Sequence, residues 1–232
     1  MKRIAFGTAV AALGLSALTG CAASPSDASS PSDNGISQQP AATVLSTALS
    51  NAKNQATVHI KGKGTCPGIS TYGVDMKLTS QGTATGTINT YSGTSQVVAT
   101  PQKIYIHANK SFWAAQTTAA EAAQIGDRWV AFAPAANACY AALTSFTDIL
   151  ENYVDVPGTA TKEKSTSVYG VPAQLIAIPP DFSVWVATTG EPLPVYISSP
   201  SVALTMTMGE WGQPVSVTAP TNTVDGATVI KQ

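Results

Sequence analysis

The sequence predicts an α+β domain in which an antiparallel β-sheet is covered on one face by two or three helices. Several short segments alternate apolar and polar residues, as half-buried strands do. These segments follow one another closely along the chain, which favours antiparallel connections. Two other segments carry apolar residues at helical spacing, and such helices must bury their apolar face against the sheet.

The alternation is clearest in residues 71–79 and 202–209. Their apolar positions should share one face of the sheet. These positions are Tyr72, Val74, Met76, Leu78, Val202, Leu204, Met206 and Met208. The other expected strands surround Val58 and Ile60 or cover residues 82–91, 103–108, 128–132, 161–169, 173–178, 184–188 and 193–198.

Two segments have the spacing of amphipathic helices, residues 41–56 and 141–153. Their apolar faces consist of Val44, Leu45, Ala48, Leu49 and Ala52 in the first, and Leu143, Phe146, Leu150 and Tyr153 in the second. Thr118 and Glu121 have the spacing of a capping box, which predicts a short alanine-rich helical turn after Thr118.

The amino terminus has the form of an export signal. Lys2 and Arg3 precede an apolar stretch over residues 4–18, which is too short for a confident membrane span. The stretch ends in Leu18-Thr19-Gly20-Cys21, which resembles the lipobox of bacterial lipoproteins. That resemblance implies diacylglycerol on Cys21 and cleavage before it, and two acyl chains anchor a protein stably. An ordinary secretory signal with an incidental cysteine is the alternative.

This interpretation divides the chain into a signal peptide (residues 1–20), a lipidated tether (21–40) and one domain (41–232). The tether is rich in Ser, Pro, Asp, Ala, Gln and Gly, so we expect it to be disordered. The domain would lie on the extracytoplasmic face of the cell membrane. Export also suits the other two cysteines, Cys66 and Cys139, which we expect to form a disulfide. Two free or buried thiols are the alternative.

Nothing in the sequence points to catalysis, a metal or a cofactor. The two histidines, His59 and His107, fall on the polar side of expected strands without ligand spacing. Ser50 and Lys53 match an SxxK pattern, but the SDN letters lie upstream in the tether and no KTG box is present, so we interpret both as coincidence. Only 11% of residues are charged and the net charge is -1, which argues against nucleic acid as a partner.

Four segments together resemble a known family. They are KIYIHANKSFW (103–113), GDRWVAF (126–132), YGVPAQL (169–175) and VWVATTGEPLPVYI (184–197). Their order resembles that of actinobacterial lipoproteins of the LppX/LprG type, which have a LolA/LolB-like fold. The resemblance covers residues 43–209. It implies a strongly curved sheet, a half-barrel, with helices on its concave face and an apolar cavity that holds the acyl chains of a lipid.

The resemblance also selects candidate cavity-lining residues. Methionine is unbranched and adapts to varied apolar ligands. The candidates are Tyr72, Val74, Met76, Leu78, Phe112, Trp113, Leu204, Met206 and Met208. Simple core packing is the alternative for the set; Phe112 and Trp113 would either gate the cavity mouth or pin a loop onto the sheet.

Three functions therefore stay open. The first is a lipoprotein that binds lipid or lipoglycan acyl chains for carriage or presentation at the envelope. The second is an extracytoplasmic partner of a membrane sensor or enzyme, with no lipid cavity and an exposed apolar patch instead. The third, an undetected hydrolase, would require a cluster of ionisable groups with perturbed pKa values in a cleft.

Overall fold

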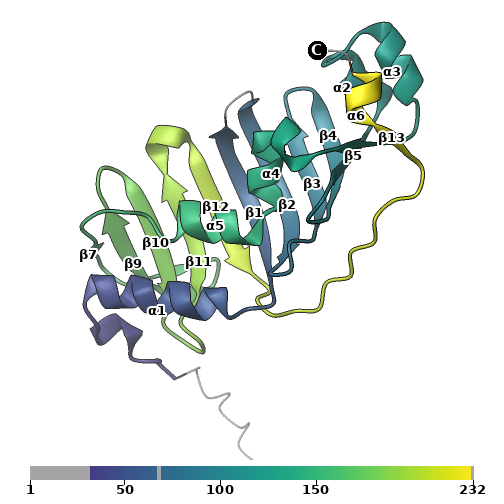
Figure 1. Cartoon of the computed structure of the whole chain (residues 1–232). Coiled ribbons are helices and arrows are strands. Elements are labelled where there is room, and N and C mark those ends of the chain that lie inside the picture. Colours follow the sequence, from purple (N-terminus) through teal and green to yellow (C-terminus); the bar gives the residue numbers. More distant parts are fainter. Residues whose placement is uncertain (1–31, 67–68, 231–232) are drawn as a thin grey trace, which may run out of the picture. The chain divides into compact units, whose positions relative to one another are not determined.

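The protein, described here from a computed structural model over residues 32–66 and 69–230, forms a single sheet with helices on one side (Figure 1). The strands are β1 (Thr57–Cys66), β2 (Ile69–Thr79), β3 (Ala84–Thr90), β4 (Gly93–Ala99), β5 (Ile104–Ala108), β6 (Trp129–Phe132), β7 (Thr161–Lys162), β8 (Thr166–Val168), β9 (Val171–Ile178), β10 (Phe182–Ala187), β11 (Pro194–Ser199), β12 (Leu204–Gly209) and β13 (Thr223–Asp225). The helices are α1 (Ala41–Lys53), α2 (Lys110–Ala114), α3 (Ala119–Ile125), α4 (Ala138–Thr144), α5 (Phe146–Tyr153) and α6 (Gly226–Val229), with short 3-10 turns η1 (Ile36–Gln38), η2 (Pro134–Ala136) and η3 (Pro200–Val202).

The sheet is an antiparallel meander with one exception. Its strand order is β13-β6-β5-β4-β3-β2-β1-β12-β11-β10-β9-β7, and β8 pairs with β9. Neighbouring strands are antiparallel except β13, which lies parallel to β6. The chain therefore builds one half outward from β1 to β6, crosses over, and returns through β9–β12 to pair β12 with β1.

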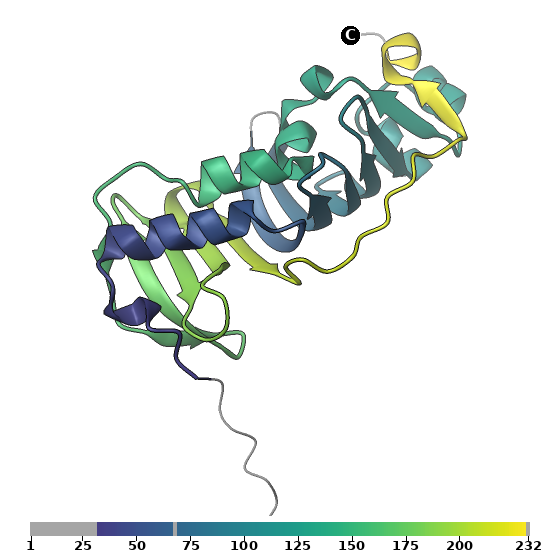
Figure 2. The same cartoon turned by 60° about the horizontal axis from the view of Figure 1, so that its bottom comes forward.

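The sheet is curved, and α1, α4 and α5 lie across its concave face (Figures 1 and 2). Glycines occupy two places where neighbouring strands come unusually close. A Cβ on Gly62 would lie 2.7 Å from the Cα of Met206, and one on Gly86 would lie 2.8 Å from the Cα of Met76. Only glycine fits such contacts. Glycine in a strand interior often marks a place where the sheet bends, so these two positions fit the curvature. The expected α+β half-barrel with helices on its concave face is confirmed.

Alternation along the strands divides the sheet into an apolar and a polar face. In β1, Ile60 is buried while its neighbours His59 and Lys61 carry ionic contacts on the opposite face. In β12, Met206 is buried while Thr207 is only partly so. The apolar face meets the helices, and the capping box at Thr118 and Glu121 is confirmed at the start of α3.

The helix expected over residues 141–153 is interrupted. The structure has two helices, α4 and α5, separated by Ser145 in an extended conformation. The Ser145 hydroxyl accepts a hydrogen bond from the backbone N–H of Asp148 at 3.1 Å, so it caps α5. Because a serine side chain stabilises a helix start better than a helix interior, the second helix begins here. Leu143 and Phe146 remain buried.

Disorder up to Pro40 is a wrong expectation for the last part of the predicted tether. Asp33 forms a β-bridge with Thr189, and the Asn34 amide donates hydrogen bonds to the carbonyls of Ala187 and Gly190, both at 3.0 Å. Ile36 is buried in the core. It is the one large apolar residue between positions 22 and 40, and its burial draws this segment onto the domain. The signal peptide, Cys21 and the first part of the tether lie outside the described residues.

Candidate functional site

The nine predicted cavity-lining residues come together in one buried cluster on the concave side. Four of them come from β2 and three from β12, and both strands flank β1. Each is at most 3% exposed, and all belong to the same core. They share the core with Ile60 of β1 and Ile149 of α5. The sequence therefore identified most of one apolar surface, but it was wrong for Val202, which lies in η3 and is 47% exposed. Whether that surface accepts a ligand stays a prediction, because these side chains also pack against one another.

Phe112 and Trp113 lie in the short helix α2, which the sequence did not predict. The Asn109 side chain begins the helix by accepting a hydrogen bond from the backbone N–H of Phe112 at 2.9 Å. The two rings meet edge to face at 5.2 Å between centroids. Both are buried, so they hold α2 against the sheet.

The indole Nε1 of Trp113 is enclosed in this apolar region without a hydrogen-bond partner among the described residues. The hydroxyl of Tyr72 is enclosed there too, close to the Tyr153 hydroxyl but without a well-aligned hydrogen bond to it. Burial, reinforced by the nearby Tyr153, strongly raises the pKa of Tyr72. The hydroxyl of Tyr140 is different, because it lies 3.0 Å from the hydroxyl of Ser95. A buried polar group without a partner costs about 1–3 kcal/mol. The concave side thus offers two donors that an ester or hydroxyl oxygen could satisfy.

Two pockets open along the borders of the helical cover. One, of about 240 Å³, lies between the β4–β5 turn and the junction of α4 and α5. The other, of about 370 Å³, lies between α1 and the segment after α5. Pro101, Ser145 and Asp148 contribute to the first, and Leu45 and Val156 to the second. Both pockets lie where helices α1, α4 and α5 meet neighbouring segments. They mark places where these helices could separate from the sheet.

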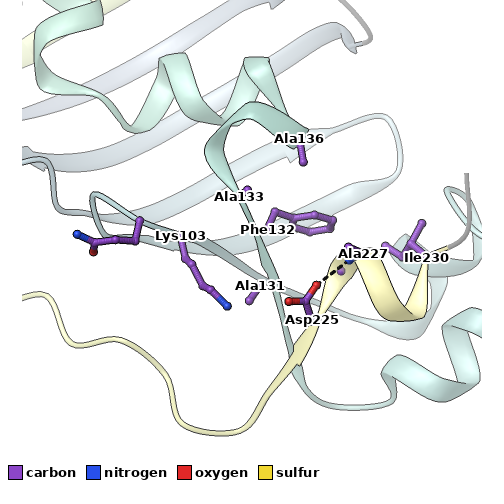
Figure 3. Close-up of a pocket in the computed structure, with 10 residues that line it drawn as sticks. Lys103, Ala131, Phe132, Ala133, Ala136, Asp225, Ala227 and Ile230 are labelled. Carbon is purple, nitrogen blue, oxygen red and sulfur yellow. Dashed lines mark hydrogen bonds between the residues drawn. The ribbon is translucent and has the colours of Figure 1, made fainter.

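A larger pocket, of about 540 Å³, lies beside β6 and the carboxy-terminal strand (Figure 3). Phe132 and Ile230 give it an apolar wall, and Lys103 and Asp225 add charge. A Cβ on Gly226 would lie 2.5 Å from the Phe132 ring, so α6 is pressed closely against β6. This pocket lies at the β13–β6 end of the sheet, and β9 lies near the other end. Helices α1, α4 and α5 contribute no residue to its lining.

The convex face carries a network of charged side chains that includes His59. Its Nε2 lies 2.6 Å from Asp75 and its Nδ1 lies 2.9 Å from Glu210. Lys61 pairs with Asp75 at 2.8 Å and Lys77 pairs with Glu210 at 2.7 Å. We call these five residues the charged network.

Ion pairing sets the pKa values in this network. Hydrogen bonds from Lys77 and then His59 lower the pKa of Glu210 to about 2. Partial burial opposes ionisation of Asp75, but hydrogen bonds from Lys61 and His59 outweigh it and lower the pKa of Asp75. Both carboxylates are therefore held ionised by cations, which is the behaviour of an ion-pair network. The second histidine, His107, contacts Asp127 at 2.9 Å.

Three aromatic residues beside the charged network were missed in the sequence. Tyr169, from the β8–β9 turn, meets Tyr196 of β11 at 5.9 Å between ring centroids, and Tyr196 meets Trp185 of β10 at 4.9 Å. We call these three residues the aromatic cluster. The signal was present, because Tyr196 alternates with the buried Ile197 and must face away from the core.

The described residues provide neither a metal centre nor a membrane-spanning helix. No group of three or more His, Cys, Asp or Glu side chains within them could hold a metal ion. Within the same part of the chain, every helix is too short or too polar to cross a bilayer. Cys139 is buried in α4, whereas the side chain of Cys66 lies outside the described part, so the disulfide stays a prediction.

Comparison with solved structures identifies the fold. LprF from Mycobacterium bovis matches 82% of this chain and 99% of its own, with a TM-score of 0.54 and 16% identity. The lipoprotein LppX from Mycobacterium tuberculosis matches 81% of this chain and 100% of its own, with a TM-score of 0.51 and 15% identity. The chain therefore has the fold of LppX/LprG-type lipoproteins. No family model matches the sequence, and no curated protein matches it.

Proposed function

We propose that this protein is a lipid-anchored lipoprotein of the extracytoplasmic membrane face that binds acyl chains between its concave sheet and its helices. It binds rather than catalyses. The observation that carries the proposal is the continuous apolar surface of β2, β1 and β12, covered by the separate helices α1, α4 and α5. The LppX/LprG-type fold supports it.

Acyl chains would enter by parting the helices from the sheet. The pockets beside α5, at Ser145 and at Val156, lie on the borders where this separation would begin. Burial of each chain methylene contributes about 0.8 kcal/mol, so a chain of ordinary length can replace the contacts between helix and sheet. The hydroxyl of Tyr72 and the Nε1 of Trp113 would then donate hydrogen bonds to ester oxygens of the lipid.

Anchoring and ligand binding fit together physically. Diacylglycerol on Cys21 would keep the domain at the membrane, and residues 22–32 would form the tether, because the domain already begins at Asp33. A lipid leaving the bilayer would therefore find the opening nearby at high effective concentration.

Displacement of the fluorescent fatty acid cis-parinaric acid tests the proposal on the full chain in detergent. Met206→Phe and, separately, Met76→Phe enlarge side chains on the concave surface and should weaken binding at least tenfold. Thr207→Val is the matched control, because it lies next to Met206 but on the convex face, and it should bind as the wild type does. Melting curves identify any variant that fails to fold.

Two results would overturn the proposal. One is saturable binding that neither methionine variant changes while both variants are folded. The other is the absence of any saturable binding by the wild type. Recovery of a single envelope protein by the wild type, without any bound lipid, would favour the interaction partner instead.

A further inference from the structure

The aromatic cluster lies on the face of the sheet opposite the proposed acyl site. Trp185 and Tyr196 project from neighbouring strands, and Tyr169 reaches them from the β8–β9 turn. The Tyr169 side chain is the outermost of the three, since the residue is 80% exposed. A large apolar ring that remains in water gains little for folding, so its role is better sought outside the fold.

Tyr169 lines a groove in the convex face. It contributes to a pocket of about 420 Å³ and to a second pocket of about 460 Å³. The two pockets share Lys61, Tyr169 and Thr207, so they form one continuous depression across β1, β12 and β11. We call it the convex groove. Trp211 adds a further aromatic wall to its larger half.

The backbone holds Tyr169 in an unfavourable conformation. Its φ is +49°, and Gly170 follows at +84°, so both central residues of the turn between Val168 and Val171 are left-handed. Turns of this type favour Asn-Gly or Asp-Gly, because a tyrosine Cβ crowds the backbone there. The chain thus keeps a strained tyrosine where its side chain lines the groove, and strain of this kind concentrates at binding sites.

The charges beside the groove select the kind of ligand. Lys61 and Lys77 balance Asp75 and Glu210, with His59 between the two carboxylates. A charged ligand would meet as much repulsion as attraction in such a balanced network. A neutral ligand rich in hydroxyl groups would meet donors and acceptors in turn, since lysines donate and carboxylates accept. The hydroxyl of Thr207 donates to the backbone carbonyl of Lys61 at 2.9 Å, and its oxygen can still accept a hydrogen bond from a ligand in both pockets.

We propose that the convex groove is a binding site for a neutral saccharide. Sugar rings would place their C–H faces on Tyr169, Tyr196 and Trp211, and their hydroxyl groups on Lys61, Glu210 and Thr207. The two sites occupy opposite faces of the sheet, and they come closest at Trp211, which lines the groove and also meets Phe146 of α5 at 6.5 Å between ring centroids.

Titration calorimetry of the full chain with neutral hexasaccharides of glucose, mannose, galactose and arabinose tests this site. At least one should bind with a dissociation constant below about 1 mM. Binding should persist in about 0.5 M salt, because a neutral ligand is not screened. The fluorescence of Trp185 and Trp211 should change on binding, since these residues lie in contact with the ligand or with Tyr196.

Tyr169→Asn separates binding from folding. Asparagine suits the left-handed conformation, so the melting temperature should stay the same or rise, while affinity should fall at least tenfold. Tyr91→Asn is the control, because Tyr91 is 77% exposed and does not contribute to the groove. The proposal is overturned if no neutral hexasaccharide binds, if a sulfated hexasaccharide or a hexapeptide binds in preference, or if Tyr169→Asn binds as the wild type does.

Discussion

Gly62 lies against the backbone of Met206, its partner in the β1–β12 ladder, so closely that a Cβ would stand 2.7 Å from the Met206 Cα. Both strands are continuous there, so neither can easily give way. The contact joins the two halves of the sheet, since β1 begins one half and β12 closes the other.

Gly62→Ala should therefore destabilise the domain by about 1–3 kcal/mol, the usual range for forcing atoms into a packed interior. Urea unfolding measures the change. Gly209→Ala is the control, because no atom lies within 4 Å of the Cβ it would add, and it should be nearly neutral. Equal stability of the two variants would show that Gly62 does not hold the bend.

Removal of the Tyr72 hydroxyl should have the opposite effect from removal of the Tyr140 hydroxyl. Tyr72→Phe deletes a buried hydroxyl that lies close to the Tyr153 hydroxyl without a well-aligned hydrogen bond to it, so the lipid-free protein should become more stable. Tyr140→Phe deletes the contact with Ser95 and should cost about 1 kcal/mol. Thermal melting of delipidated samples measures both. If the two variants lose the same stability, the Tyr72 hydroxyl does form a stabilising hydrogen bond with Tyr153.

The charged network should stabilise the fold in a pH-dependent way. The pKa of Glu210 falls from its ordinary 4.5 to about 2 on folding, so the unfolded chain binds more protons between these values. The contribution is therefore complete above pH 4.5 and is lost as the pH falls toward 2. Because Glu210 is exposed, the effect should be small and should weaken with salt.

Glu210→Gln tests this dependence by melting between pH 2 and pH 7. The stability difference from the wild type should shrink as the pH falls through that window. Glu151→Gln, an exposed change on α5, serves as the control. A difference that stays constant from pH 7 to pH 2 would contradict the ion-pair account.

We also predict a disulfide between Cys66 and Cys139. It would link the β1–β2 hairpin to α4 and so limit how far this helix separates from the sheet. Alkylation of the oxidised full chain, followed by mass spectrometry, should leave both cysteines unmodified until reduction. Reduction should cost about 4–5 kcal/mol on the chain-entropy model. Alkylation of either cysteine before reduction would contradict the pairing.

The sequence predicted the elements that have strong periodicity. Strand β2 and helix α1 were found nearly to their ends, because alternation and helical spacing report which face is buried. Strand β4 was missed because Ser95, a polar residue, lies buried on its core face, where its hydroxyl contacts the backbone carbonyl of Ile88. Strand β13 was missed because its three residues depend on pairing with β6, a contact that no local pattern reveals.

The two surfaces differ in how far the sequence predicts them. The concave residues were identified because burial imposes a pattern on β2 and β12. The convex groove was not, because Tyr169, Tyr196 and Lys61 come from three distant segments that only the folded sheet brings together. Alternation places Tyr196 on the face away from the core, but it does not reveal which exposed residues of distant strands become neighbours in the folded sheet.

Mass spectrometry of lipid extracted from the full chain, purified from its own host, tests acyl binding most directly. Organic solvent separates bound lipid from the acyl groups that would be attached to Cys21. We predict an acyl-containing lipid at close to one molecule per wild-type or Thr207→Val protein, and much less with Met206→Phe. Equal lipid with folded Met206→Phe, or none with the wild type, would contradict the account.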